Sequence, residues 1–231
     1  MRWLHGVLGG VRAILPIAAP LLASALLIQN DPAVTFRAVF LVVLCMAVVT
    51  AAKVTMAIAR PASLEIRRTR ALGAPGQPLV DTIGLFVFLT YLIGWLGFLP
   101  LDAGRLHLLP APPLWATVLG LVFALLGCLI GQRALWDNSF ASPAVQKHAG
   151  QTVVSTGVYG VVRHPLYSGN LLVFTGMALW VGSVAGLLGV MVIFTFTLAR
   201  VLIEERHLRD SLPGYAAYAR AVRSRLIPFV L

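Results

Sequence analysis

Long apolar runs, separated by short polar or proline-containing segments, dominate the hydrophobic pattern of the chain. A hydrocarbon core of about 30 Å requires roughly 20 apolar residues per helix. The Asp31-Pro32 pair before one run predicts a helix start, with aspartate as N-cap and proline at the first helical position. Against this length, the pattern predicts membrane-spanning helices near residues 11–29, 33–59, 79–100 and 112–132.

The apolar residues from about 168 to 203 are too many for one crossing. A straight helix of that length would extend roughly 54 Å, nearly twice the hydrocarbon thickness. The run is interrupted at Trp180-Val181-Gly182-Ser183, and we therefore expect a hairpin of two helices. Its first arm, about 168–181, would span only some 21 Å, so its N-terminal end is expected inside the membrane boundary. The predicted fold class is all-α: a polytopic integral membrane protein with about six transmembrane helices, the last two a short helical hairpin.

Charge then orients these spans. The chain is 59% hydrophobic and only 11% charged, yet its net charge is +10. Six spans place sixteen of the 18 basic residues on one face and leave Arg37 and Arg105 opposite. Because basic residues favour the cytoplasmic side, we assign that face, with both termini, to the cytoplasm. A five-span alternative would put the basic C-terminal segment outside. The charge therefore indicates topology and contact with the lipid bilayer, and we expect no nucleic-acid partner.

Ionisable residues kept close to membrane helices are candidates for function. The first group is Arg163-His164-Pro165, with Tyr159 and Tyr167 around it. Pro165 disfavours helical geometry in the residue before it, and His164 is a potential base or hydrogen-bond donor. The alternative is a simple helix-start loop in which Arg163 extends towards lipid headgroups.

The second group is Arg200 with Glu204 and Glu205, at the polar end of the last apolar run. Arg200 and Glu204 are four residues apart and share one face of a helix. One interpretation is a stabilising ion pair beside basic anchors for anionic lipid. The other starts from the two adjacent glutamates, which require a partner next to the hydrocarbon. A ligand ammonium or a second arginine would provide it.

Other kinds of chemistry have no matching pattern. His5, His107, His148 and His207 form no cluster at metal-ligand spacing, so we predict no metal. The two cysteines, Cys45 and Cys128, lie in apolar runs and are interpreted as core residues. Glycines such as Gly127 and Gly131 have the small-xxx-small spacing of close helix contacts, and packing within one protomer is preferred over a dimer interface.

Two ordered segments, QTVVSTGVYGVVRHPLY at 151–167 and RVLIEERHLRDSLPGYAAYARAVRSRLIPF at 200–229, resemble the isoprenylcysteine carboxyl methyltransferase family. Phospholipid N-methyltransferases and bacterial thiol methyltransferases belong to the same superfamily. The resemblance covers about 135–231, whereas residues 1–130 are similar only in being transmembrane. It implies a membrane enzyme that binds S-adenosylmethionine in a pocket on the cytoplasmic side.

The resemblance also implies roles for individual residues. Arg200, Glu204 and His164 would be catalytic, with Arg200 facing the methyl acceptor. The cofactor would be lined by Gln151, Thr152, Val153, Val154, Tyr159, His164, Pro165, Leu166, Tyr167, Glu204 and Glu205.

The chain departs from the family pattern at several positions. The family often has histidine at Gln151, leucine at Val153 and an Arg-Val pair at Ala221-Val222, and the stretch 212–215 is one residue shorter than in eukaryotic prenylcysteine enzymes. These departures argue against a prenylcysteine substrate. The shorter stretch is similar to that of bacterial members, which implies a bacterial inner membrane as the location. We expect a lipophilic or small membrane-permeable acceptor with a carboxylate, thiol or amine. Residues 1–132 would form a bundle that gives the acceptor access, and 133–231 the catalytic region.

Two alternatives stay open at this point. Sterol-type reductases share a similar Arg-His-Pro-x-Tyr segment but use NADPH. They usually carry an arginine- and aspartate-rich motif at the place of Glu204-Glu205, and two carboxylates suit an ammonium or sulfonium better than a 2′-phosphate. The second alternative is a non-catalytic membrane protein that retains the fold.

Overall fold

The computed structural model describes residues 18–27, 31–60, 79–140 and 152–230. The regular elements within these ranges are all helical, which confirms the predicted fold class for this part of the chain. They are the helix Ala18–Leu27, α2 (Pro32–Ala59), α4 (Leu79–Leu101), the π-helical turn η1 (Asp102–Leu106), α5 (Leu114–Asp137), the 3-10 turn η2 (Gly157–Gly160), α6 (Pro165–Val181), α7 (Ala185–Ser211) and α8 (Tyr215–Ala221).

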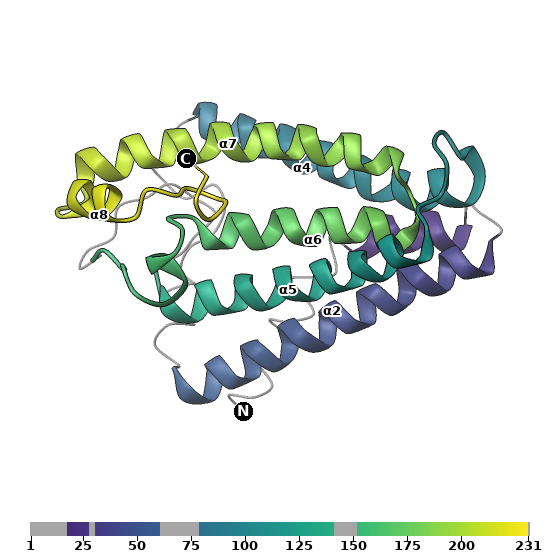
Figure 1. The fold of residues 1–231 in the computed structure, drawn as a ribbon, viewed down its shortest axis with the longest axis horizontal. Coiled ribbons are helices and arrows are strands. Elements are labelled where there is room, and N and C mark those ends of the chain that lie inside the picture. Colours follow the sequence, from purple (N-terminus) through teal and green to yellow (C-terminus); the bar gives the residue numbers. More distant parts are fainter. Residues whose placement is uncertain (1–17, 28–30, 61–78, 141–151, 231) are drawn as a thin grey trace.

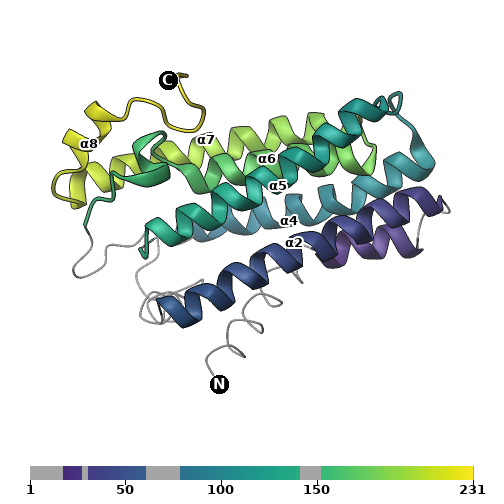
Figure 2. The ribbon, with the colours of Figure 1, turned by 60° about the horizontal axis from the view of Figure 1, so that its bottom comes forward.

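The long helices run side by side along the long axis of the molecule (Figure 1). Helix α8 and the C-terminal segment lie at one end of this bundle, beside the C-terminal end of α7 and the loop that leads into α6 (Figure 2). This end of the bundle collects the polar residues that the sequence singles out.

Among the described residues, four helices are long and apolar enough to cross a membrane: α2, residues Ile83–Leu106, α5 and α7. Two shorter apolar helices, Ala18–Leu27 and α6, accompany them. Large apolar side chains such as Phe86 and Trp115 are 71% and 70% exposed on their outer faces, as expected for helices in contact with lipid. The predicted spans near 33–59, 79–100 and 112–132 are confirmed as apolar helices. The span near 11–29 is described only over Ala18–Leu27, and the count of six crossings stays a prediction.

Local signals place the start of α2 where the sequence predicts it. The Asp31 carboxylate accepts a hydrogen bond from the Ala33 amide at 2.8 Å, and Pro32 is the first helical residue. The side chain thereby pairs one of the amides that a helix start leaves free. The predicted N-cap is confirmed.

The predicted hairpin is also confirmed, with two corrections to its length. Gly182 ends α6 with a φ of 104°, a left-handed conformation that favours glycine. Helix α6 begins at Pro165 rather than near 168, and α7 continues to Ser211 rather than stopping near 203. The second arm, at 27 residues, is therefore not short. Helix α7 extends beyond its apolar run because residues from other segments, such as Arg163 and Arg225, contact Glu205 in its polar last turns.

Helices α5 and α6 approach each other so closely at their glycines that a larger residue would not fit at these contacts. A Cβ at Gly127 would meet the Gly169 carbonyl oxygen, and one at Gly120 would lie 2.6 Å from the Leu179 Cβ. The predicted packing of these glycines within one protomer is confirmed. Cys45 and Cys128 are buried between α2 and α5, with their sulfurs 3.8 Å apart, which confirms them as core residues.

Candidate functional site

The loop before α6 sets the position of His164. The residue has a φ of −125° and a ψ of 60°, outside the helical region, because Pro165 follows it at the first position of α6. Its side chain is 6% exposed, and its ring centroid lies 5.8 Å from that of Tyr167. The proline therefore holds the histidine at the polar end of the bundle, as predicted.

Glu205 is the centre of a buried ion cluster. The Arg163 Nε donates to one carboxylate oxygen at 2.6 Å, and the His164 Nε2 lies 3.3 Å from the same oxygen. Arg209 and Arg225 reach the other oxygen, each at 3.3 Å. Glu205 itself is only 3% exposed. Its charge is thus compensated by groups from α7, from the loop before α6 and from the C-terminal segment.

Arg163 also holds the C-terminal segment against the bundle through hydrogen bonds to its backbone. Its Nη1 donates to the carbonyl oxygens of Val222 and Arg223, both at 2.8 Å. Its backbone amide donates to the Ser224 carbonyl at 3.0 Å. The side chain is buried, so the interpretation in which it extends towards lipid headgroups is wrong. The sequence placed Arg163 in the first candidate group but assigned it no role, because its partners come from distant parts of the chain.

Glu204 has a different environment from its neighbour. It is half-buried, and one carboxylate oxygen accepts a hydrogen bond from the Tyr167 hydroxyl at 3.0 Å. Arg200 lies one turn earlier on the same helix and is also half-buried. Its positive charge acts on Glu204, in keeping with the face that the four-residue spacing predicts. The hairpin therefore brings residues near 165 and near 204 together.

Four of the five tyrosines of the chain lie at this end of the bundle: Tyr159, Tyr167, Tyr215 and Tyr218. The Tyr218 hydroxyl donates to the Tyr159 carbonyl at 2.8 Å, and the rings of Tyr215 and Tyr218 are 5.7 Å apart. Burial raises the pKa of both of the latter phenols, so they keep their protons at neutral pH. Sequence reasoning missed Tyr215 and Tyr218, whose spacing of three on a short helix was the signal.

The remaining predicted cofactor residues differ in their burial and contacts. Val153 packs against the apolar group formed by Leu212, Tyr215 and Tyr218, and Val154 is half-buried beside it in the sequence. Thr152 is exposed, Leu166 is half-buried on α6, and Gln151 lies outside the described residues.

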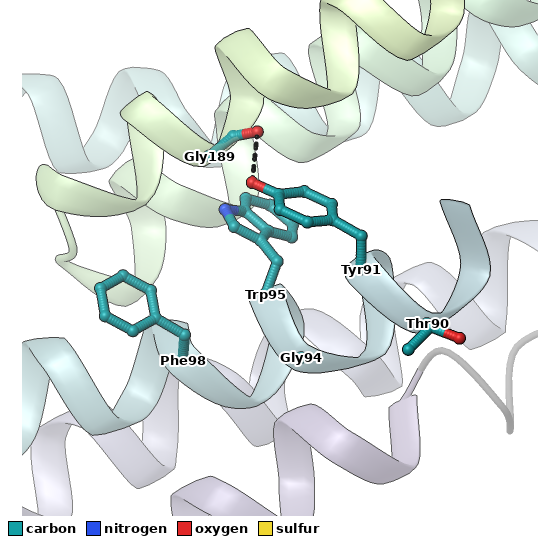
Figure 3. A pocket seen from close by; sticks show the side chains of 6 residues that line it. All are labelled: Thr90, Tyr91, Gly94, Trp95, Phe98 and Gly189. Atoms are coloured by element: carbon teal, nitrogen blue, oxygen red, sulfur yellow. Dashed lines mark hydrogen bonds between the residues drawn. The ribbon is translucent and has the colours of Figure 1, made fainter. Parts of the chain in front are cut away.

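A second feature is an aromatic pocket of about 350 Å³ between α4 and α7 (Figure 3). The Tyr91 hydroxyl donates to the Gly189 carbonyl at 3.1 Å, and the Trp95 Nε1 donates to the Gly186 carbonyl at 2.9 Å. Because these polar atoms are already paired with α7, the rings present apolar surface to the pocket. Its lining consists of Thr90, Tyr91, Gly94, Trp95, Phe98 and Gly189.

Comparison with known proteins connects this geometry to a family. Residues 115–213 match the family model described as phospholipid methyltransferase. The predicted family resemblance is confirmed. The methyltransferase-like region, as we call 115–213, contains α5, α6 and α7 with both predicted polar groups. Together with the apolar helices, this match indicates a membrane protein that contains a region similar to membrane methyltransferases.

Two curated relatives are similar over part of their length. The cobalt-zinc-cadmium resistance protein CzcN of Cupriavidus metallidurans is 31% identical over 108 residues, which are 46% of this chain and 48% of that protein. The protein-S-isoprenylcysteine O-methyltransferase B of Arabidopsis thaliana is 28% identical over 121 residues, 50% of this chain and 61% of the relative. The chain thus spans about half to three fifths of the length of these relatives.

Proposed function

We propose that the protein is an S-adenosylmethionine-dependent methyltransferase whose acceptor is lipophilic or small and membrane-permeable. The observation that carries this proposal is the polar cluster around Glu204 and Tyr167, within the methyltransferase-like region and at one end of an apolar bundle. A carboxylate in a half-buried aromatic environment suits a cationic ligand. The proposed acceptor group is a carboxylate, a thiol or an amine.

The residues at this end of the bundle fit the cofactor in chemical type. Glu204 would hold its positive charge, while the rings of His164, Tyr159 and Tyr167 would supply apolar and aromatic contact. The remaining proposed lining comes from Gln151, Thr152, Val153, Val154, Pro165, Leu166 and Glu205. Both oxygens of Glu205 contact cationic side chains, so we assign it the role of holding His164 and Arg163 in place.

The cofactor, when bound, supplies a methyl group on a sulfonium, which a nucleophile displaces in line. The protein therefore contributes mainly by positioning the two reactants. Arg200 would orient an anionic acceptor through paired hydrogen bonds. A carboxylate acceptor requires no base, whereas a thiol or an amine must lose a proton.

The aromatic pocket would receive the apolar part of the acceptor. Gly189 precedes Arg200 by eleven positions on α7, which corresponds to about 16 Å along the helix. A hydrocarbon chain whose reactive group lies at Arg200 can therefore extend to the pocket. The names of the two relatives refer to different contexts, a prenylated protein and metal resistance, so the acceptor has to be identified by experiment.

Orientation in the membrane supports the same proposal. The polar end of the bundle carries Arg206, Arg209, Arg220, Arg223 and Arg225. If this end faces the cytoplasm of a bacterial cell, as the charge rule predicts, it meets the compartment where S-adenosylmethionine is made. Both termini would then be cytoplasmic.

The test is an untargeted methylation assay. Membranes that contain the protein are incubated with methyl-labelled S-adenosylmethionine, and lipids, small molecules and proteins are analysed for the label. Membranes with Arg200→Ala serve as the control, because this change removes the proposed acceptor contact. We expect a product that depends on the intact protein. Equal labelling in both preparations would contradict the proposal.

A thermal-shift titration separates this function from a reductase. S-adenosylhomocysteine should raise the unfolding temperature of the purified protein, and NADPH should leave it unchanged. Stabilisation by NADPH alone would instead assign the site to a reductase.

A further inference from the structure

The C-terminal segment after α8 turns back along the bundle towards the start of α6 (Figure 1). Its backbone carbonyls at Ser224 and Arg225 accept hydrogen bonds from the loop before α6, each at 3.0 Å. The Leu226 carbonyl accepts one from the Ser168 hydroxyl at 2.5 Å, and the Leu226 side chain is buried. The segment is therefore docked on the first turn of α6 as far as Leu226.

Beyond this docked part, the apolar side chains are exposed. Residues 227–230, which we call the C-terminal tip, carry Ile227, Phe229 and Val230. Ile227 and Val230 are about half exposed, and Phe229 is fully exposed. Apolar surface of this kind is unfavourable in water, and a group of such side chains on a docked segment indicates a contact outside the protein.

The backbone holds Phe229 in its exposed position. Its φ is 64°, a left-handed conformation that a bulky residue rarely adopts. The Phe229 amide donates to the Ser224 hydroxyl at 2.9 Å, and the Val230 amide donates to the Ile227 carbonyl at 3.1 Å. Because strained backbone persists only where the surrounding structure enforces it, the exposure of this ring is a defined feature of the fold.

The C-terminal tip lies at the level where the apolar parts of α6 and α7 meet their polar ends. Ser168, the partner of Leu226, begins the apolar run of α6. On α7 the apolar run ends at Ile203, which is 52% exposed, and the Tyr167–Glu204 hydrogen bond places this point beside the first turn of α6. This level corresponds to the boundary between hydrocarbon and headgroups, so lipid is the material available to cover the tip.

Exposed arginines accompany the C-terminal tip. Arg220 lies in the last turn of α8, and Arg223 precedes the Ser224 hydroxyl that holds the Phe229 amide. Apolar side chains beside positive charge are complementary to a membrane interface, where acyl chains meet anionic headgroups. A pairing of two tips from two copies of the chain would instead bring like charges together.

We propose that the C-terminal tip is an interfacial anchor, which inserts Ile227, Phe229 and Val230 between the lipids at the polar end of the bundle. The anchor ties the loop that carries His164 to the bilayer, because backbone hydrogen bonds join that loop to the C-terminal segment. The inference concerns a contact with lipid and does not depend on the reaction that the protein catalyses.

The test measures the depth of the tip in nanodiscs of phosphatidylglycerol and phosphatidylcholine. A fluorescent label is attached to Phe229→Cys in the full-length protein, with Cys45 and Cys128 changed to alanine. Asp210→Cys is the matched control, because Asp210 is exposed at the polar end of α7. We expect the label at 229 to be quenched several-fold more by nitroxides on the acyl chains, and several-fold less by aqueous iodide, than the label at 210.

Hydrogen exchange without a label provides a second readout. Phe229 is fully exposed, so its replacement removes no buried contact within the described structure. In nanodiscs, Phe229→Ser should speed the exchange of the amides in residues 224–230, whereas Phe229→Leu, which stays apolar, should exchange as slowly as the parent. Leucine and serine both carry a Cβ atom, so the strain at this position is similar in the two variants.

Three results would overturn the anchor. The first is equal quenching by iodide at positions 229 and 210, which would place the tip in water. The second is equal exchange rates in Phe229→Leu and Phe229→Ser. The third is a label at 229 that neither quencher reaches, together with cross-linking of Phe229→Cys between two copies of the chain, because protein would then cover the tip.

Discussion

Two buried acidic side chains occupy opposite ends of the α6–α7 hairpin. Asp102, 2% exposed, lies beside the turn and accepts hydrogen bonds from the Ser183 hydroxyl at 2.6 Å and the Leu108 amide at 3.0 Å. Glu205, 3% exposed, lies at the other end, where its partners include three arginines. One carboxylate is thus held by neutral donors and the other mainly by charged ones.

The difference indicates that the two ends have different tasks. Neutral donors around Asp102 join the end of α4 to the hairpin turn and complete the local structure. A buried ion cluster is a costly way to obtain the same stability, because each charge must be removed from water. We therefore interpret the cluster at Glu205 as the scaffold of a charged site, in which the half-buried Glu204 is the residue that meets a ligand.

The largest effect is expected for Glu205→Gln. Removal of its negative charge leaves Arg163 buried without a counterion, which should lower the free energy of unfolding by about 3–5 kcal/mol. Thermal unfolding in detergent measures the change. Arg209→Ala is the matched control, since Arg209 contacts the same carboxylate from a half-exposed position and should cost less than about 1 kcal/mol. Equal stability of Glu205→Gln and the parent would show that the cluster does not hold this end together.

A smaller effect is expected at the opposite end, for Asp102→Ala. Loss of the carboxylate leaves the Ser183 hydroxyl and the Leu108 amide without their acceptor, which should lower the free energy of unfolding by about 1–3 kcal/mol. The affinity for S-adenosylhomocysteine should not change, because the site lies at the far end of the hairpin. Thermal unfolding and calorimetric titration of the same preparation measure both quantities. A weaker affinity would mean that the two ends are coupled, contrary to the division of tasks.

The smallest effect concerns the aromatic pocket. A Cβ atom at Gly94 would meet no atom within 4 Å, so Gly94→Leu starts its side chain in open space beside the pocket and should fill part of it. It should lower kcat/KM for a long-chain acceptor by roughly fourfold for each methylene group displaced, because each buried methylene contributes about 0.8 kcal/mol. Gly84→Leu is the control, as Gly84 is equally open but does not line the pocket. Identical kinetics of the two variants would show that the acceptor does not occupy the pocket.

Much of the fold could be predicted because its signals are local. Apolar length places the helices, and Asp31, Pro165 and Gly182 mark helix ends through backbone conformations that single residues favour. The end of α7 could not be placed in this way. Its last turns are polar, and long-range contacts from Arg163 and Arg225 to Glu205 stabilise them. A prediction from apolar length alone therefore placed the end of α7 too early.

The meeting of the two polar groups could be predicted from the sequence, but not the detail of their contacts. The hairpin follows from the sequence, and it brings the residues near 164 and near 204 together. The separation of Glu204 from Glu205 depends on the rotation of α7, because successive residues on a helix point about 100° apart. The sequence does not record which of two adjacent glutamates faces the cluster.

The most direct test of the central claim is the binding of S-adenosylhomocysteine to the purified full-length protein, measured by calorimetry beside Glu204→Gln and His164→Ala. Glu204→Gln keeps the shape of the side chain and removes only its charge. The account predicts that the parent binds and that both variants bind more weakly. Absence of binding by the folded parent, or equal affinity of all three proteins, would contradict it.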